Sequence, residues 1–336
     1  MPALITLAVL GSTLILLGSL LFIWWLDRYE REPFWTVLLV LAWGGFGGTS
    51  LGCLCSLPFA IAATALGGEV FGGAFAAVVV APIVEELTKG VVFLLLIPLR
   101  SIDNETDGLI YGAAAGLGFA AVENVLYFLQ AAEGSAALLL GTVFIRTFFT
   151  SLVHCISSAL LGMCLGHAVH RAGSLRWLAW PIVGVVLAAI NHALWNGLAT
   201  AAELRAIGEM SGVLVLLGML LVGGASVLMF LLTQWSLRRE HAVIARELLA
   251  EAAAGTLPAE HAAIIPFWTR RRRDGWLPPG VPRERYVRAA TLLAFRRRQL
   301  EIARGERAER YTADIHRFRS EVRAMLGDAA RALPAI

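Results

Sequence analysis

The sequence predicts an all-α protein, a polytopic bundle of about seven and at most eight transmembrane helices with a basic, mostly helical cytoplasmic tail. Of its 336 residues 58% are hydrophobic and the mean hydropathy is +0.71, whereas soluble domains are about 45–50% apolar. Residues 236–336 hold 20 of the 28 Lys and Arg but only 12 of the 25 Asp and Glu, a net charge of +8. We therefore expect a membrane domain over residues 1–235 and a basic C-terminal region over residues 236–336.

Apolar segments long enough to cross a bilayer as helices recur throughout the expected membrane domain. They run over about 3–25, 34–66, 73–98, 108–131, 138–169, 177–200 and 211–235. The second segment is long and contains Pro58 and several glycines, so we expect a kink there, and a hairpin within it would add an eighth span. Glycine at every fourth position, as at Gly108, Gly112 and Gly116, predicts close helix packing.

The basic residues of the short loops indicate the orientation, because Lys and Arg favour the cytoplasmic side. Arg28, Arg100 and the tail that starts at Arg238 fall on one side of the membrane if the segments are counted as above. This count places the N-terminus outside and the C-terminus in the cytoplasm. The first apolar segment lacks a basic beginning and a small-residue cleavage site, which favours an uncleaved first helix.

The third apolar segment carries two adjacent carboxylates and a lysine, Glu85, Glu86 and Lys89. Ionisable groups inside a bilayer cost about 2.5–3.5 kcal/mol each on insertion scales and usually mark a function. On a helix Glu85 and Lys89 stand four residues apart and can pair, while Glu86 points about 100° away. We expect one carboxylate to be neutralised and the other to be free. A buried ion pair that only stabilises helix packing is the alternative.

Polar residues on four predicted helices lie at one depth. At 1.5 Å per residue from the cytoplasmic helix ends, Glu85 and Glu86 lie roughly 18–20 Å deep, Glu123 and His154 roughly 22 Å, and His192 roughly 21 Å. Unrelated structural polar residues would scatter in depth, so we expect one composite site. The alternatives are a hydrogen bond between helices at Glu123 and histidines that bond only to their neighbours.

Two kinds of chemistry suit these side chains. Paired carboxylates can activate a water as general base and then general acid, and His192 with Asn196 one turn later can stabilise an oxyanion. Two His and one or two Glu could instead hold zinc with an open position for water. The candidate metal ligands are Glu86, Glu123, His154 and His192. No HExxH motif is present, which excludes a zincin arrangement.

Five motifs in order resemble those of the PrsW intramembrane proteases, which are related to the CAAX-prenyl protease and bacteriocin-processing superfamily. The motifs are the loop 27–33 (DRYEREP), Glu85-Glu86-x-x-Lys89, Phe119-x-x-x-Glu123-Asn124, His154 and His192-x-x-x-Asn196. The resemblance implies a membrane-embedded endopeptidase in the bacterial cytoplasmic membrane that cuts membrane-protein substrates, as in regulated cleavage of an anti-sigma factor. It implies Glu85 and Glu86 as the catalytic pair, with His154 and His192 as essential partners.

The chain departs from the wider superfamily in two places. The superfamily usually has His where this chain has Glu123, and Arg one residue beyond Lys89. Its members have been described both as metalloproteases and as glutamate proteases. We favour a metal-free mechanism with a Glu-activated water and keep zinc as the alternative. The expected catalytic residues are Glu85, Glu86, Glu123, His154, His192 and Asn196, supported by Lys89, Asn124 and Ser158.

A proton-coupled transporter that uses the same residues as a relay, or a non-catalytic membrane scaffold, is the alternative function. A transporter would favour inverted repeats with broken helices, which the sequence does not show. In the tail, the run Arg270–Arg273 precedes a helix expected from Pro282 to about Leu326. Such basic clusters attract anionic lipid at about 1 kcal/mol per residue, and no nucleic-acid-binding motif is present.

Overall fold

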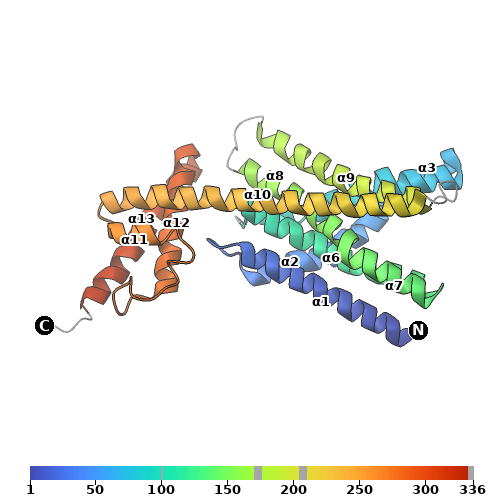
Figure 1. Cartoon of the computed structure of the whole chain (residues 1–336). Coiled ribbons are helices and arrows are strands. Elements are labelled where there is room, and N and C mark those ends of the chain that lie inside the picture. Colours follow the sequence, from blue (N-terminus) through green and yellow to red (C-terminus); the bar gives the residue numbers. More distant parts are fainter. Residues whose placement is uncertain (100, 170–175, 204–209, 332–336) are drawn as a thin grey trace. The chain divides into compact units, whose positions relative to one another are not determined.

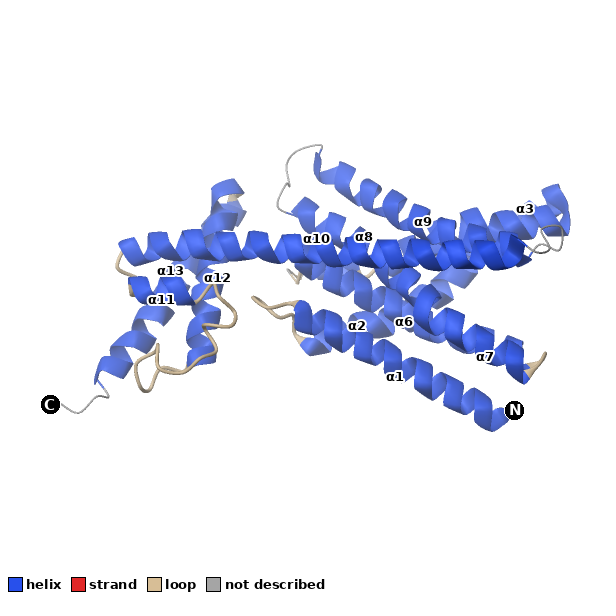
Figure 2. Ribbon diagram, viewed as in Figure 1, coloured by secondary structure: helices blue, strands red, loops and turns tan. Residues whose placement is uncertain are grey.

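Helices make up the protein, and the described part of the chain contains no strand (Figure 2). The computed structural model describes residues 1–99, 101–169, 176–203 and 210–331. The chain separates into two compact units, one of Met1–Leu26 with Glu32–Leu232 and one of Asp27–Arg31 with Thr233–Ile336. The expected all-α class is therefore confirmed.

The first unit begins with α1 (Pro2–Leu26) and continues as a helical stretch over Phe34–Leu96 (Figure 1). Its parts are α2 (Phe34–Ala42), the π-helical turn η1 (Trp43–Gly48), α3 (Thr49–Phe75), the π-helical turn η2 (Ala76–Val80), α4 (Ala81–Gly90) and α5 (Phe93–Leu96). Gly68 inside α3 has φ 78° and ψ 171°, a conformation that favours glycine and interrupts the helix. A Cβ on Gly72 would lie only 2.4 Å from Thr64 Cα, so the chain folds back here.

The fold-back at Gly68 separates the second and third apolar segments. Helix is continuous from Phe34 to the residue before this glycine, so no hairpin lies within residues 34–66. The described residues contain six helical stretches that are long and apolar enough to cross a membrane, with Phe34–Leu96 counted as one. Counting its two arms separately gives seven segments. Large apolar side chains such as Leu66 and Trp35 are 91% and 78% exposed, as expected of a lipid-facing surface.

The rest of the first unit surrounds one central helix. Its elements are α6 (Glu105–Ala132), α7 (Ala136–Ile145), the π-helical turn η3 (Arg146–Thr150), α8 (Ser151–Val169), α9 (Arg176–Glu203) and the first half of α10 (Ser211–Ala253). In α6, 72% of the membrane-crossing window is buried, more than in any other span of the described chain. A capping box starts this helix, because Asn104 and Asp107 each accept a hydrogen bond from the other's backbone N–H.

Glycines let α6 approach the backbone of α8. A Cβ on Gly112 would lie 2.1 Å from the Ser158 carbonyl oxygen, and a Cβ on Gly116 would lie 2.2 Å from the His154 carbonyl oxygen. No larger residue fits at these distances, so the predicted small-residue packing is confirmed. The glycines thereby determine where α8 presents His154 and Ser158.

Replacing Gly112 with leucine is expected to separate α6 from α8. Overpacking typically costs about 1–3 kcal/mol, and here the clash is with backbone that cannot rotate away. We expect a lower thermal unfolding midpoint and a large loss of activity in the purified protein. The matched control is Gly18→Leu on α1, where an added Cβ meets nothing within 4 Å. Equal midpoints for Gly112→Leu and the wild type would contradict this packing.

The second unit is a small helical domain around its own apolar core. The end of α10 is joined by α11 (Ala259–Ile264), α12 (Arg283–Ile302) and α13 (Glu306–Arg331). Core residues include Ile244, Leu248, Tyr286, Leu293 and Val322. The single helix expected from Pro282 to about Leu326 is wrong. It breaks because Ala303 is extended, with ψ 152°, and Gly305 has φ 58°.

A buried carboxylate joins three helices of the second unit. Glu251 on α10 accepts hydrogen bonds from Arg297 on α12 and Arg319 on α13, and from Thr256 at 2.6 Å. We expect Glu251→Gln to lower the stability of this unit by about 3 kcal/mol, because it leaves the Arg319 guanidinium without its anion and the Arg297 guanidinium with Glu247 alone. Limited proteolysis of the full-length protein against temperature measures the change. Glu306→Gln, at a side chain 90% exposed, is the control.

Candidate active site

The two adjacent glutamates lie on α4, which is placed by the π-helical turn before it. In η2 the Ala81 N–H donates to the Ala76 carbonyl, five residues earlier. A hydrogen bond of the same spacing from the next residue, Pro82, would go to the Ala77 carbonyl. Pro82 has no N–H, and Asn196 Nδ2 on α9 donates to that carbonyl instead, at 2.9 Å. Asn196 therefore connects α9 to η2, the turn that leads into α4.

Glu86 is the centre of a buried hydrogen-bond network. Its Oε1 accepts from Lys89 Nζ at 2.7 Å and lies 3.1 Å from His192 Nδ1, and its Oε2 accepts from Ser158 Oγ at 2.8 Å. The Glu86 side chain is fully buried. The expected ion pair of Lys89 with Glu85 is present but long, at 3.8 Å, and the shorter pair is the one with Glu86. Residues three apart also face each other on a helix, and Ser158 and His192 hold Glu86 in place.

Lys89 links the two glutamates to α8. Its Nζ lies 2.9 Å from His154 Nδ1 and 4.0 Å from the centre of the Phe119 ring. An ammonium group can only donate, so His154 Nδ1 must accept in this contact. A neutral His154 then carries its proton on Nε2. That nitrogen lies 2.8 Å from Glu123 Oε2, in an orientation that makes no hydrogen bond.

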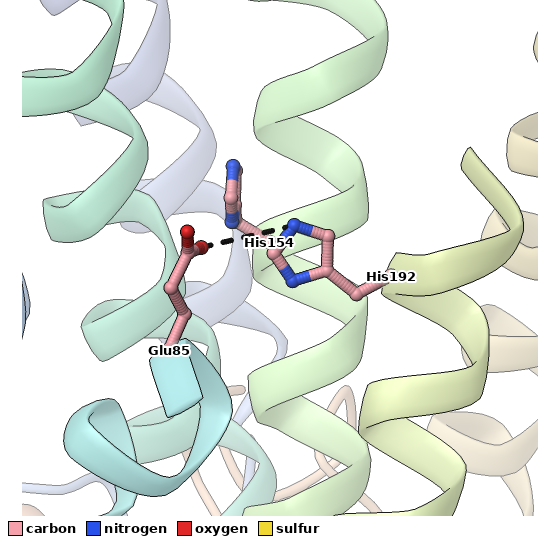
Figure 3. Close-up of side chains that lie close together, drawn as sticks. All are labelled: Glu85, His154 and His192. Atoms are coloured by element: carbon pink, nitrogen blue, oxygen red, sulfur yellow. Dashed lines mark ion pairs between the residues drawn. The ribbon is translucent and has the colours of Figure 1, made fainter. Parts of the chain in front are cut away.

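Glu85 is the less constrained of the two glutamates. Its buried Oε2 has no hydrogen-bond partner and lies 3.8 Å from His192 Nε2. Because His192 Nδ1 contacts the Glu86 carboxylate, Nδ1 carries the proton of the neutral ring and Nε2 presents a lone pair toward Glu85. Figure 3 shows Glu85, His154 and His192 converging from α4, α8 and α9.

Glu123 is paired on the far side of His154. Arg146 Nη2 donates to Glu123 Oε2 at 2.7 Å, and Arg146 Nε donates to Asn124 Oδ1 at 3.0 Å. The same guanidinium lies 3.6 Å from the centre of the Tyr127 ring. The π-helical turn η3 begins at Arg146, and this residue packs against α6.

A cavity of about 920 Å³ opens beside these groups. Its polar lining includes Glu123, His154, His192 and Asn196, and it extends to Glu203 near the end of α9. Most of the other lining residues are apolar or small, such as those of α7. The fold therefore brings together the polar residues that were predicted to lie at one depth in the membrane. The cavity beside them is large enough for a peptide segment.

Comparison with known proteins supplies the family. A profile described as PrsW family intramembrane metalloprotease matches residues 32–238, more than half of the chain. The chain belongs to the PrsW family. The match contains α4, α6, α8 and α9 and thus every residue of the site. Family membership establishes a protease and an integral membrane protein.

Named members of the PrsW family share this region. Protease PrsW of Bacillus subtilis (strain 168) is 26% identical over 178 residues, which cover 52% of this chain and 74% of that protein. Protease PrsW of Geobacillus kaustophilus (strain HTA426) is 29% identical over 178 residues, covering 53% and 72%. No solved structure matches the chain.

The PrsW family description implies a metal, and the donor set fits one. Glu85, His154 and His192 each offer a ligand atom, all within 4.8 Å of one another, and two imidazoles with one carboxylate suit zinc. Glu85 Oε2 is buried without a hydrogen-bond partner, as expected of an atom that awaits a ligand, whereas His154 Nε2 lies 2.8 Å from Glu123 Oε2. His154 can bind through Nε2 only after losing its proton there.

The metal ligands expected from the sequence include the same two histidines as the group in the structure, but different glutamates. Glu86 and Glu123 were the expected acidic ligands, whereas the structure groups Glu85 with the two histidines. Glu86 is occupied by Lys89 and Ser158, and Glu123 by Arg146. The depth of a residue along its helix could not distinguish a metal ligand from a glutamate paired with Lys89 or Arg146. That distinction depends on the direction in which each carboxylate points from its helix.

Two functional contacts were missed by sequence reasoning. Phe119 covers Lys89 and lies 5.2 Å, ring to ring, from His154. Arg146 holds Glu123 and Asn124 together. The position of Phe119 one turn before Glu123 was the available signal for the first contact, whereas the second depends on the π-helical turn, which no pattern indicated.

Proposed function

We propose that the chain is an intramembrane endopeptidase that hydrolyses a peptide bond of membrane-protein substrates at Glu85, His154 and His192. The proposal rests on two facing acceptors, Glu85 Oε2 and His192 Nε2, 3.8 Å apart. An ionised carboxylate and an imidazole lone pair repel each other unless a proton donor or a cation lies between them. A water there would be positioned for activation beside the cavity.

Each residue has a distinct role in this proposal. Glu85 accepts the proton of the attacking water and later returns it to the leaving amine. Glu86 is a positioning residue that holds the His192 ring through Nδ1, and Lys89 holds Glu86 and His154. A metal bound by Glu85, His154 and His192 would polarise the scissile carbonyl and acidify water. Glu85 would then be the anionic ligand of the metal, whereas without a metal it is the proton acceptor.

Asn196, next to His192, supplies the donor of the proposed oxyanion site, since the Nδ1 proton of the neutral His192 ring is directed to Glu86. The Asn196 amide has two N–H groups, and only one is needed for the Ala77 carbonyl. Both residues line the cavity, so the second N–H is available to a substrate carbonyl that enters it. Glu123, held ionised by Arg146, would stabilise a positive charge that develops on His154 during the reaction.

The proposed substrate is a membrane-protein segment that enters the cavity. The apolar and small lining residues suit a transmembrane helix or an unwound part of one. Regulated cleavage of a membrane-anchored anti-sigma factor is the case that the family resemblance suggests. We place the enzyme in the bacterial cytoplasmic membrane with its N-terminus outside and its basic tail in the cytoplasm.

Cleavage of single-span proteins by the purified enzyme in nanodiscs tests this function. A panel that includes anti-sigma factors is expected to contain a substrate that the wild type cuts and His192→Ala does not. His167→Ala is the matched control, because His167 pairs with Glu105 away from the site. Equal cleavage by the wild type and His192→Ala would contradict the proposed site, and movement of protons or solute without cleavage would favour a transporter.

A further inference from the structure

A second cavity lies in the second unit, where residues 27–31 meet the segment after α11 and the start of α12. Its volume is about 460 Å³. Six arginines line it: Arg28, Arg31, Arg271, Arg272, Arg283 and Arg288. Only two carboxylates are in the lining, Glu30 and Glu284, so the formal charge of the lining is +4. Such a lining attracts an anion.

Buried donors without partners mark one side of this cavity. Arg271 is only 8% exposed and its Nη1 has no hydrogen-bond partner, and Thr291 is 1% exposed with an unpartnered hydroxyl. Arg28 Nε is likewise buried without a partner. Buried polar groups are nearly always hydrogen bonded, and an acceptor bound in the cavity would supply partners for these three donors.

Arg271 is held in position for such an acceptor. Its Nη2 donates to the Arg28 carbonyl, and its guanidinium lies 5.3 Å from the centre of the Tyr29 ring. Burial lowers the pKa of Arg271, because removing the guanidinium charge from water is unfavourable. Asp27 acts on this charge but is not part of the cavity lining.

We propose that this cavity binds a phosphate group through Arg271, Arg28 and the Thr291 hydroxyl. Guanidinium and hydroxyl donors that converge from different segments match the several acceptor oxygens of a phosphate. The phosphate belongs either to a soluble anion or to a lipid headgroup. The lipid is within reach because residues 27–33 connect two apolar helices, α1 and α2. This site is independent of the peptidase chemistry.

Calorimetric titration of inorganic phosphate into the full-length protein in a neutral detergent tests the site. At constant ionic strength we expect saturable binding by the wild type, and binding about tenfold weaker in Arg271→Gln and in Thr291→Val, the loss typical of one charge-assisted hydrogen bond. Thr291→Val keeps the side-chain shape and so guards against misfolding. Arg323→Gln removes the same charge outside the cavity and should bind as the wild type does.

Native mass spectrometry of the wild type and the same variants, released from nanodiscs, distinguishes a lipid headgroup from a soluble anion as the source of the phosphate. Phosphatidylglycerol retained by the wild type and lost from Arg271→Gln and Thr291→Val assigns the site to a lipid headgroup. Phosphate binding without such lipid retention assigns it to a soluble anion. The proposal is overturned if the wild type binds neither probe, or if all variants bind equally.

Discussion

Glu85→Gln is expected to lower the rate of peptide cleavage by about 10²–10⁴-fold, the usual contribution of a general base. Glutamine keeps the shape of the side chain but cannot accept the water proton. It cannot serve as an anionic metal ligand either, so the loss is expected with or without a metal. The measurement is the initial rate of cleavage by purified protein in nanodiscs.

The same variant should keep its stability. Glu85 Oε2 has no hydrogen-bond partner, and its distance of 3.8 Å to Lys89 and to His192 makes each ion pair weak. We expect a thermal unfolding midpoint equal to that of the wild type. Glu69→Gln is the control, since this exposed glutamate lies, like Glu85, in the helical arm that follows the fold-back at Gly68. A Glu85→Gln protein that unfolds early would indicate a structural rather than a chemical role.

Glu86→Gln is expected to lower both stability and activity. It leaves the Lys89 ammonium, whose side chain is completely buried, without its close anion. Removing one partner of a buried pair typically costs about 3–5 kcal/mol. It also changes the contact that orients His192, so the rate should fall even at temperatures where the variant remains folded. Thermal unfolding and cleavage rates of one preparation measure both effects.

A double variant separates the two effects of Glu86. Adding Lys89→Met to Glu86→Gln removes the unpaired charge and should recover much of the stability. The activity should stay low, because His192 and His154 both lose their positioning contacts. Recovery of activity together with stability would show that Glu86 and Lys89 only hold the helices together.

Much of the fold could be predicted from the sequence because a bilayer restricts the options to apolar helices. The apolar segments predicted the helices, and the glycine stripe on α6 predicted a close helix contact, which the structure shows to be with α8. The break at Gly68 was not located, since glycine permits a positive φ without requiring it. The separate helices α12 and α13 were missed for the same reason at Gly305.

The sequence predicted which residues form the candidate site but not which of their side chains pair with each other. Equal depth brought Glu123, His154 and His192 to one level, and the structure places them in contact. Which glutamate pairs with Lys89 depends on side-chain direction and on Ser158 of another helix, and neither is visible in spacing along one helix. The π-helical turns before α4 and α8 rotate their side chains in a way that an ideal period of 3.6 residues does not describe.

Mapping the new termini of a cleaved single-span substrate tests the central claim most directly. Mass spectrometry of the reaction with the wild type should identify two complementary fragments whose new ends lie in or next to the apolar segment. The same substrate incubated with Glu85→Gln should remain intact. Identical fragments from both proteins would show that the cleavage does not depend on the centre formed by Glu85, His154 and His192.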